Sequence, residues 1–318
     1  QYQATPVVQD NLIMNSPYGI YLLGNESTEA NISGNEIING DEVGIYVNEI
    51  SSVIIDSNSV TGFEDGISVL NGTAVISNNT LESCGGSIRL DDVDATITGN
   101  EILNSSDYPL THIDNIDATY NDNTITGSLK PAVGVSGTLT ENTYWSSIDG
   151  FDVPYVLTGD LTISSIATLS IEAGTIVKFE YFSGNGYRRS LIVDGTLDVQ
   201  GTETDHVVFT SNRDDSSGGD TNGDGGATSP AAGDWGYIKI NSSNNLQNCT
   251  LKYGGKGYYS SGNYSSTYMV WVNNVQPAIT ISQCTFNNAY DKAIYYDDNQ
   301  YQATPVVQDN LIMNSPYV

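Results

Sequence analysis

The sequence has few basic residues, with ten Lys and Arg against 38 Asp and Glu and a formal net charge of −28 at pH 7. Proteins that bind nucleic acid or anionic lipid surfaces do so through Lys and Arg, so neither partner is expected here. Strongly acidic, polar chains are often disordered. This chain is expected to fold, because Val, Ile, Leu and Tyr recur at regular spacing from end to end.

Cysteines and long apolar runs are also scarce. Three Cys, at positions 84, 249 and 284, are too few for a scaffold held by disulfides, and no CxxC pair indicates zinc. No apolar run reaches about 18 residues, so direct insertion into a membrane is not expected.

A short repeat fills the first half of the chain. The stretches VVQDNLI, ISGNEII, IIDSNSV, VISNNTL, TITGNEI and TYNDNTI carry an Asn at the same place, and these Asn are 24, 23, 21, 21 and 23 residues apart. An apolar or aromatic residue precedes each Asn by three positions, and an aliphatic residue follows it by two. Another apolar residue comes nine or ten positions after it. Each repeat therefore predicts three short strands separated by polar turns.

A period near 22 residues with several short strands is typical of a parallel β-helix, in which each coil forms hydrogen bonds with the next. Stacked coils place equivalent residues about 4.8 Å apart. Asn suits such a column because its amide donates to one coil and accepts from another. We therefore interpret the Asn column as a structural ladder. Its predicted members are Asn11, Asn35, Asn58, Asn79, Asn100, Asn123, Cys249, Cys284 and Asn310.

Cys249 and Cys284 take the place of Asn in LQNCTL and ISQCTF. They are expected to lie on adjacent coils inside the wall, either as thiols that pack like small apolar groups or as a disulfide. Thiols are favoured, because stacking in parallel register suits a disulfide poorly.

Six phrases, TLSIEAGTIVKF, LIVDGTLDVQGT, VVFTSNRDD, GGDTNGDGG, GDWGYIKI and NCTLKYGG, stand in this order between residues 168 and 255. Together they resemble the opening half of right-handed parallel β-helix modules of large bacterial and archaeal surface proteins, in the pectate-lyase-like superfamily. The resemblance implies an all-β, right-handed parallel β-helix with coils of about 21–25 residues and two loop insertions. It leaves function open, since this fold carries lyases, hydrolases, adhesins and spacers.

The eighteen residues QYQATPVVQDNLIMNSPY occupy positions 1–18 and return at 300–317, after which Gly19 is answered by Val318. We interpret residues 1–144 as the closing coils of one module, 145–299 as the start of the next, and 300–318 as the first coil of a further repeat. A β-helix cut within its stack exposes unpaired strand edges that invite addition of another copy. The expected partner is therefore the chain itself, joined covalently in a tandem array or as separate subunits.

The sharpest local motif lies in the acidic stretch 213–235. Asp220, Asn222 and Asp224 alternate before Gly225, as in the first half of an EF-hand calcium loop, although Ala231 stands where the final Glu is usual. Asp214, Asp215 or Asp234 could supply the missing carboxylate. A structural Ca²⁺ ion is the expected cofactor, and a solvated acidic loop is the alternative.

A second insertion, from Tyr253 to Trp271, is rich in aromatic residues. Such a loop could contact another unit, stack on a sugar of a cell-surface or glycan ligand, or cover the coil wall. The candidate interface residues are Tyr258, Tyr259, Tyr264, Tyr268 and Trp271.

Catalysis finds little support in the sequence. No GHG motif is present, and neither His112 nor His206 lies in a recognisable signature. Arg188 and Arg189 have no acidic cluster beside them, and the pairs at 91–92 and 297–298 are expected by chance in so acidic a chain. The sequence therefore predicts a non-catalytic, extracellular structural repeat of a fibre, sheath, stalk or adhesin. The alternative is a carbohydrate-binding or polysaccharide-degrading β-helix.

Overall fold

The computed structural model describes residues 4–25, 27–148, 153–184, 188–242, 244–257, 259–260, 263–264, 267–273, 279–297 and 305–317. Contacts divide the chain into two compact units. Unit 1 comprises residues 1–134 with 148–153, and unit 2 comprises residues 135–147 with 154–318. The regular elements of the described residues are all β-strands. No described helix could cross a membrane by its length and apolarity.

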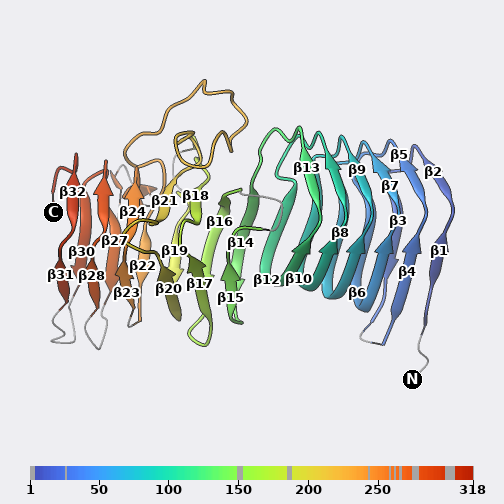
Figure 1. Cartoon of the computed structure of the whole chain (residues 1–318), viewed down its shortest axis with the longest axis horizontal. Coiled ribbons are helices and arrows are strands. Elements are labelled where there is room, and N and C mark those ends of the chain that lie inside the picture. The colour runs from blue at the N-terminus through green and yellow to red at the C-terminus, as the bar shows by residue number, and fades with distance from the viewer. Residues whose placement is uncertain are drawn as a thin grey trace. The chain divides into compact units, whose positions relative to one another are not determined.

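Unit 1 is a stack of coils that pair in parallel (Figure 1). In each coil a three-residue strand follows the ladder Asn, and one or two further strands complete the turn. The strands are β1 (Val7–Gln9), β2 (Leu12–Met14), β3 (Tyr18–Leu23), β4 (Glu29–Ser33), β5 (Glu36–Ile38), β6 (Val43–Asp56), β7 (Ser59–Thr61), β8 (Asp65–Ser77), β9 (Thr80–Glu82), β10 (Gly86–Thr98), β11 (Glu101–Leu103), β12 (Leu110–Asn121) and β13 (Thr124–Thr126).

Aliphatic columns fill the interior of unit 1. Ile32, Ile55 and Ile76 are aligned by strand pairing and fully buried. A second column, on the short strands, contains Ile37 and Val60. Burial of such side chains removes apolar surface from water at about 25 cal/mol per Å². The spacing at which aliphatic residues repeat in the sequence is thus the spacing that places them in the same buried column.

Two residues with left-handed backbone conformation bracket the short strand that follows each ladder residue. In the second coil they are Gly34 (φ 66°) and Asn39 (φ 59°), one before and four after the ladder Asn35. Asn and Gly tolerate this conformation better than other residues. The same two places are left-handed in nine coils, at Asp10 and Asn15, Gly34 and Asn39, Ser57 and Gly62, Asn78 and Ser83, Gly99 and Asn104, Asp122 and Gly127, Asn248 and Tyr253, Gln283 and Asn288, and Asp309 and Asn314.

The expectation of three separate strands in every repeat is wrong for the middle coils of unit 1. β6, β8, β10 and β12 each run through the point where a polar turn was predicted. A left-handed residue lies there in each strand, such as Glu49 in β6 or Asp92 in β10, and in β8 Asn71 is followed by Gly72 with φ 140°. The pairing register of β6 and of β10 shifts beside it. A bulge of this kind bends a strand without ending it.

Unit 2 is also built from parallel strands in successive coils. β14 (Val133–Leu139) begins in unit 1 and ends in unit 2. The further strands are β15 (Thr143–Trp145), β16 (Tyr155–Ile163), β17 (Thr168–Glu172), β18 (Ile176–Phe179), β19 (Leu191–Val193), β20 (Thr196–Gln200), β21 (Val207–Ser211), β22 (Ile238–Ile240), β23 (Asn245–Gln247), β24 (Cys249–Lys252), β25 (Tyr259–Ser260), β26 (Asn263–Tyr264), β27 (Tyr268–Asn273), β28 (Thr280–Ser282), β29 (Thr285–Asn287), β30 (Lys292–Asp297), β31 (Val306–Gln308) and β32 (Leu311–Met313).

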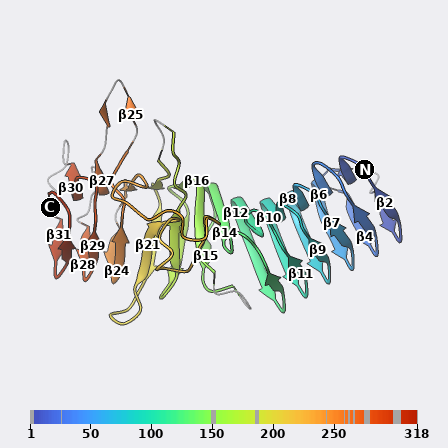
Figure 2. The same cartoon turned by 90° about the horizontal axis from the view of Figure 1, so that it is seen from above.

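Two insertions leave the coils of unit 2. The acidic stretch connects β21 to β22, and the antiparallel hairpin β25–β26 projects from the coils in Figure 2. The prediction of an all-β, parallel β-helix is confirmed in both units.

Candidate functional site: end coils, ladder and loops

The Asn column of unit 1 forms a continuous hydrogen-bonded ladder. Asn58 shows the pattern: its backbone N–H and its Nδ2 donate to Oδ1 of Asn79, both at 2.9 Å. Its Nδ2 also donates to the carbonyl of Ile32 in the preceding coil, at 2.9 Å. Asn35, Asn79 and Asn100 repeat this arrangement. Each amide therefore joins three coils, and the buried polar atoms are satisfied.

The cysteines continue this pattern in unit 2. The thiol of Cys284 contacts the carbonyl of Leu246 in the preceding coil at 3.4 Å and that of Ser282 in its own coil at 3.2 Å. Its backbone N–H donates to Oδ1 of Asn310 at 2.9 Å. Cys249 and Cys284 are buried free thiols whose Sγ atoms lie 3.1 Å apart. The Cys284 thiol therefore makes the carbonyl contacts of a ladder amide.

The repeated eighteen-residue segment forms an end coil in both units. At the N-terminus, β1 pairs with β4 and β2 pairs with β5, so the segment has a following coil. At the C-terminus, β31 pairs with β28 and β32 pairs with β29, so the same sequence has a preceding coil. Asn11 donates to Oδ1 of Asn35 at 2.9 Å, and Asn310 donates to the carbonyl of Ile281 at 2.8 Å. One sequence thus pairs on either side with unchanged corner conformations.

The carboxylates of the acidic stretch accept hydrogen bonds from backbone N–H groups of the same stretch. The carboxylate of Asp220 accepts from the N–H groups of Gly223 and Gly225, each at 2.8 Å. That of Asp224 accepts from Gly226 at 2.8 Å and from Ala227 at 3.0 Å. The nearby hydrogen bonds, that of the Thr228 hydroxyl first, lower the pKa of Asp224.

Lysines enter the same stretch from the coil wall. Lys178, fully buried, donates to the carbonyls of Gly219 at 2.6 Å and Asp214 at 3.2 Å. Burial lowers the pKa of Lys178 to about 8. Lys252 pairs with Asp214 at 2.6 Å. Burial opposes ionisation of Asp214, but hydrogen bonds from Lys252, Ser216 and Thr210 outweigh it and lower its pKa. Two ammonium groups thus bind Asp214, one of the residues predicted to complete the calcium site.

The other predicted calcium ligands, Asp215, Asn222 and Asp234, do not share one site: Asp234 contacts the coil wall, whereas Asp215 and Asn222 lie near Asp224. Asp234 accepts from Ser211 and pairs with Arg213 at 3.2 Å, and burial raises its pKa. Burial also raises the pKa of Asp215, followed by the charges of Asp220 and Asp224. Asn222 donates to Asp224 at 2.9 Å. Among the described residues no three His, Cys, Asp or Glu side chains are grouped to hold a metal ion, and calcium binding stays a prediction.

The aromatic insertion differs from the predicted loop. Tyr268 and Trp271 lie in β27, which pairs with β22 and β30, so they belong to a coil wall. Tyr268 stacks on Tyr295 with ring centroids 4.3 Å apart, and Lys239 lies 4.2 Å from the ring centre of Trp271. Tyr259 and Tyr264 are paired in the hairpin β25–β26. Tyr258 lies outside the described residues.

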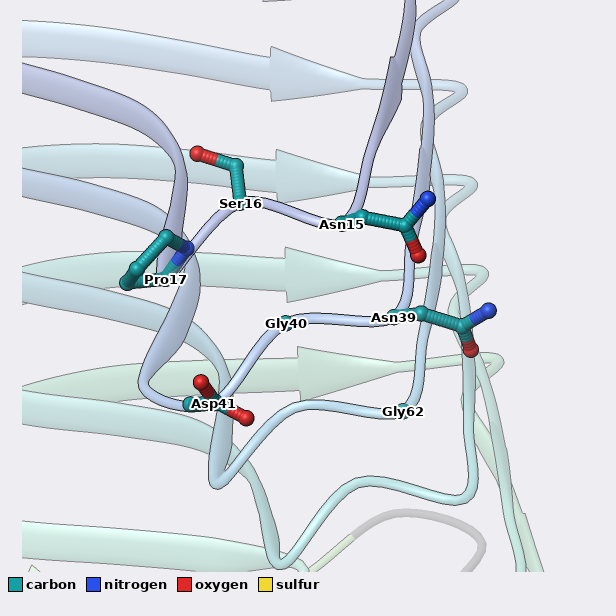
Figure 3. A pocket seen from close by; sticks show the side chains of 7 residues that line it. All are labelled: Asn15, Ser16, Pro17, Asn39, Gly40, Asp41 and Gly62. Atoms are coloured by element: carbon teal, nitrogen blue, oxygen red, sulfur yellow. The ribbon is translucent and has the colours of Figure 1, made fainter.

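A surface pocket of about 400 Å³ lies beside the corners of the first three coils (Figure 3). It is lined by Asn15, Ser16, Pro17, Asn39, Gly40, Asp41 and Gly62. Asn15 and Asn39 occupy equivalent corners and extend their amides on the same side. Asp41 is the one ionisable group among these lining residues. The pocket therefore offers hydrogen bonding rather than a paired acid and base.

The groups considered for catalysis have structural partners. His112 bonds to the Tyr120 hydroxyl, and burial lowers the pKa of His112 to about 4. His206 bonds to Thr250 at 3.0 Å. Arg189 pairs with Glu180 at 3.3 Å. Arg188 donates to the carbonyl of Gly233, Asp91 faces Arg89, and Asp92 accepts from Asn115. Of the second acidic pair, Asp297 ends β30 and Asp298 lies outside the described residues.

Sequence reasoning missed a stacked pair of tyrosines in the first two coils. Tyr21 and Tyr46 are aligned by the pairing of β3 with β6, and their rings stack with centroids 4.6 Å apart and an interplanar angle of 11°. Tyr21 is 50 % exposed. The spacing from the ladder could have revealed this pair, because Tyr21 follows Asn11 by ten residues and Tyr46 follows Asn35 by eleven.

Comparison with protein families gives two matches. Residues 1–150 match the family described as periplasmic copper-binding protein (NosD), and residues 137–266 match the family described as pectate-lyase like beta helix domain. Searches of curated proteins and of solved structures give no significant match. With the parallel coils of both units, these matches, each over less than half of the chain, support a parallel β-helix of the pectate-lyase-like superfamily.

Proposed function

We propose that this chain is a structural repeat of an extracellular fibre, sheath or surface stalk, extended end to end by further β-helix coils. The observation that carries the proposal is the repeated segment, which pairs with a following coil at one end and with a preceding coil at the other. Superposing the two copies of the segment gives a single coil with neighbours on both sides. A location outside the cytoplasm is supported by the match to a family described as periplasmic.

The exposed edges of the end coils support addition of another copy. Leu12 and Met14 in β2 are 60 % and 54 % exposed, and Leu311 in β32 is 53 % exposed. An unpaired strand edge is a template for another strand, and natural proteins usually protect such edges. Stacking a further coil would pair these backbone groups and remove apolar surface from water. The acidic surface keeps an assembled fibre soluble.

The test is assembly of the purified chain, followed by electron microscopy and sedimentation. Filaments with an axial repeat of about 60 Å are expected, since about twelve coils are spaced about 4.8 Å apart. Ile13→Asp places a charge in the aliphatic column at the open end and should abolish filaments. Ile166→Asp is the matched control, because Ile166 is 80 % exposed and lies between β16 and β17, away from the end coils. A chain that remains monomeric at all concentrations would contradict the proposal.

A second candidate is carbohydrate binding or polysaccharide degradation, which the name of the family matched by residues 137–266 favours. Turnover of uronate polymers with calcium, together with a glycan array, tests it. Reproducible activity that Asp-to-Asn substitutions abolish would favour this candidate over a structural role.

Copper binding, named in the description of the other family, finds no matching ligand set in the sequence of the matched residues 1–150. Copper prefers imidazole, thiolate and thioether ligands. Residues 1–150 contain one of each, namely His112, Cys84 and Met14. Met14 lies in β2 and His112 in β12, whereas Cys84 is buried between β9 and β10. We therefore assign no role to copper.

A further inference from the structure

We propose that Cys249 and Cys284 form a site of reversible oxidation, at which a disulfide bond joins two successive coils of unit 2. The bond forms by exchange with a low-molecular-weight disulfide such as oxidised glutathione. It adds a covalent link to a wall that is otherwise held by hydrogen bonds between coils. The pair lies within one chain, so its oxidation is independent of end-to-end assembly.

Strand pairing brings the two thiols together. β24 pairs with β29 so that Thr250 lies opposite Thr285, and each cysteine directly precedes one of these partners. Coils spaced about 4.8 Å apart satisfy the range of about 4.4–6.8 Å that a disulfide allows between Cα atoms. Parallel stacking by itself suits a disulfide poorly, but here the Sγ atoms lie 3.1 Å apart. Closing the bond requires the two sulfurs to approach by about 1 Å.

The two thiols differ in their surroundings, which gives them different roles. The thiol of Cys249 donates to Sγ of Cys284, and this hydrogen bond lowers the pKa of Cys284. The same hydrogen bond raises the pKa of Cys249, and burial raises it further. Because the thiolate is the nucleophile, Cys284 attacks the small disulfide and Cys249 completes the exchange.

The exchange conserves atoms and electrons. The Cys284 thiolate attacks one sulfur of the small disulfide, whose S–S bond breaks and releases one small thiol. Sγ of Cys249 then attacks Sγ of Cys284, and the mixed disulfide breaks to release the second small thiol. The protons of both cysteines end on the two small thiols, and two electrons pass from the protein to the small disulfide. Local opening of these coils gives the reagent access, because both thiols are buried.

The coil between the two cysteines is the one that carries the aromatic insertion. These ladder residues are 35 positions apart, against 21–24 between Asn11 and Asn123, and the hairpin β25–β26 lies between them. A longer loop costs more chain entropy to order, and a cross-link that closes it removes more of that cost. Neither cysteine supplies the amide that joins three coils in unit 1. The disulfide therefore stabilises a long coil where the ladder has no amide.

The test is a count of free thiols after equilibration with reduced and oxidised glutathione, both in the folded chain and during refolding from urea. Denaturation in an alkylating reagent should then label Cys84 alone, and the linked pair should lower the mass of the chain by two hydrogen atoms. Peptide mapping should find the 249–284 linkage. Cys84 is the internal control, since its Sγ lies 3.7 and 3.9 Å from the carbonyl oxygens of Glu82 and Val60.

Three labelled cysteines under both conditions would overturn the proposal. A linkage that includes Cys84, or a glutathione adduct on Cys284 without the 249–284 linkage, would also overturn it.

A matched pair of variants tests the effect on stability. Cys284→Ser keeps a donor for the carbonyls of Leu246 and Ser282 but cannot form the bond. Oxidation should raise the thermal midpoint of the unmodified chain and of Cys84→Ser by roughly 5–15 °C, and it should leave that of Cys284→Ser unchanged. Equal midpoints for the oxidised and reduced forms of the unmodified chain would contradict a stabilising disulfide.

Discussion

Replacing Asn79 by Ala is expected to destabilise unit 1 strongly. Asn79 is 1 % exposed, and its Oδ1 accepts from the N–H of Asn58 while its Nδ2 donates to the carbonyl of Ile55. The substitution leaves those two buried backbone groups without these partners. Each such group costs about 1–3 kcal/mol, so the expected loss is roughly 2–6 kcal/mol.

The assay is urea denaturation followed by circular dichroism, together with native-state hydrogen exchange. Exchange of the Asn58 amide should accelerate more than that of amides in distant coils, because this amide loses its acceptor. Asn121→Ala is the control, since Asn121 is exposed and its side chain bonds to Asp122. Its stability should change by less than about 0.5 kcal/mol.

Asn79→Cys sharpens this test. The thiol of Cys284 contacts carbonyls of its own and the preceding coil, as a ladder amide does. Asn79→Cys should therefore lose less stability than Asn79→Ala. Equal stability of Asn79→Ala and Asn121→Ala would refute the view that the ladder stabilises the stack.

Three further perturbations test other parts of the molecule. Lys178→Met should remove a pH dependence: the pKa of about 8 lies below the unfolded value of 10.5, so the folded chain gains stability as pH rises between them. Relative to the variant, the unmodified chain should gain about 2 kcal/mol between about pH 7.5 and 9.5 in urea denaturation, and parallel profiles would contradict this. Trp235→Ala should cost about 3–5 kcal/mol, because the buried ring stacks on Phe179 at 4.2 Å, and an unchanged thermal midpoint would contradict it. Gly19→Ala should cost about 1–3 kcal/mol through the contact with Gly44, and unchanged hydrogen exchange in the first two coils would count against it.

The period of the chain made the fold predictable. Asn spacing locates the coils, and the aliphatic residues at fixed offsets from Asn35 and Asn58 are the buried columns of unit 1. The number of strands per coil was not predictable in the same way. A polar pair such as Asp91 and Asp92 indicates a turn by composition, whereas one left-handed residue produces only a bulge when both flanking strands keep their neighbours.

The acidic stretch shows the limit of reading a loop by itself. Asp220, Asn222 and Asp224 have calcium-loop spacing, but Lys178 is distant in sequence and reaches the loop only because β18 lies beside β21. Such contacts depend on the coil stack. The same holds for Tyr268, which sequence composition assigned to a loop and which strand pairing places in β27.

The paired left-handed corners have a consequence for how this protein can diversify. The interval between them is five residues in all nine coils, whereas the spacing of successive ladder residues varies from 21 to 24 between Asn11 and Asn123 and from 26 to 35 between Cys249 and Asn310. The coil segment between the two corners therefore has a constant length, and differences in coil length are confined to the other segments of each coil. Loops inserted in those other segments could bind new ligands while the ladder segments keep the same stacking.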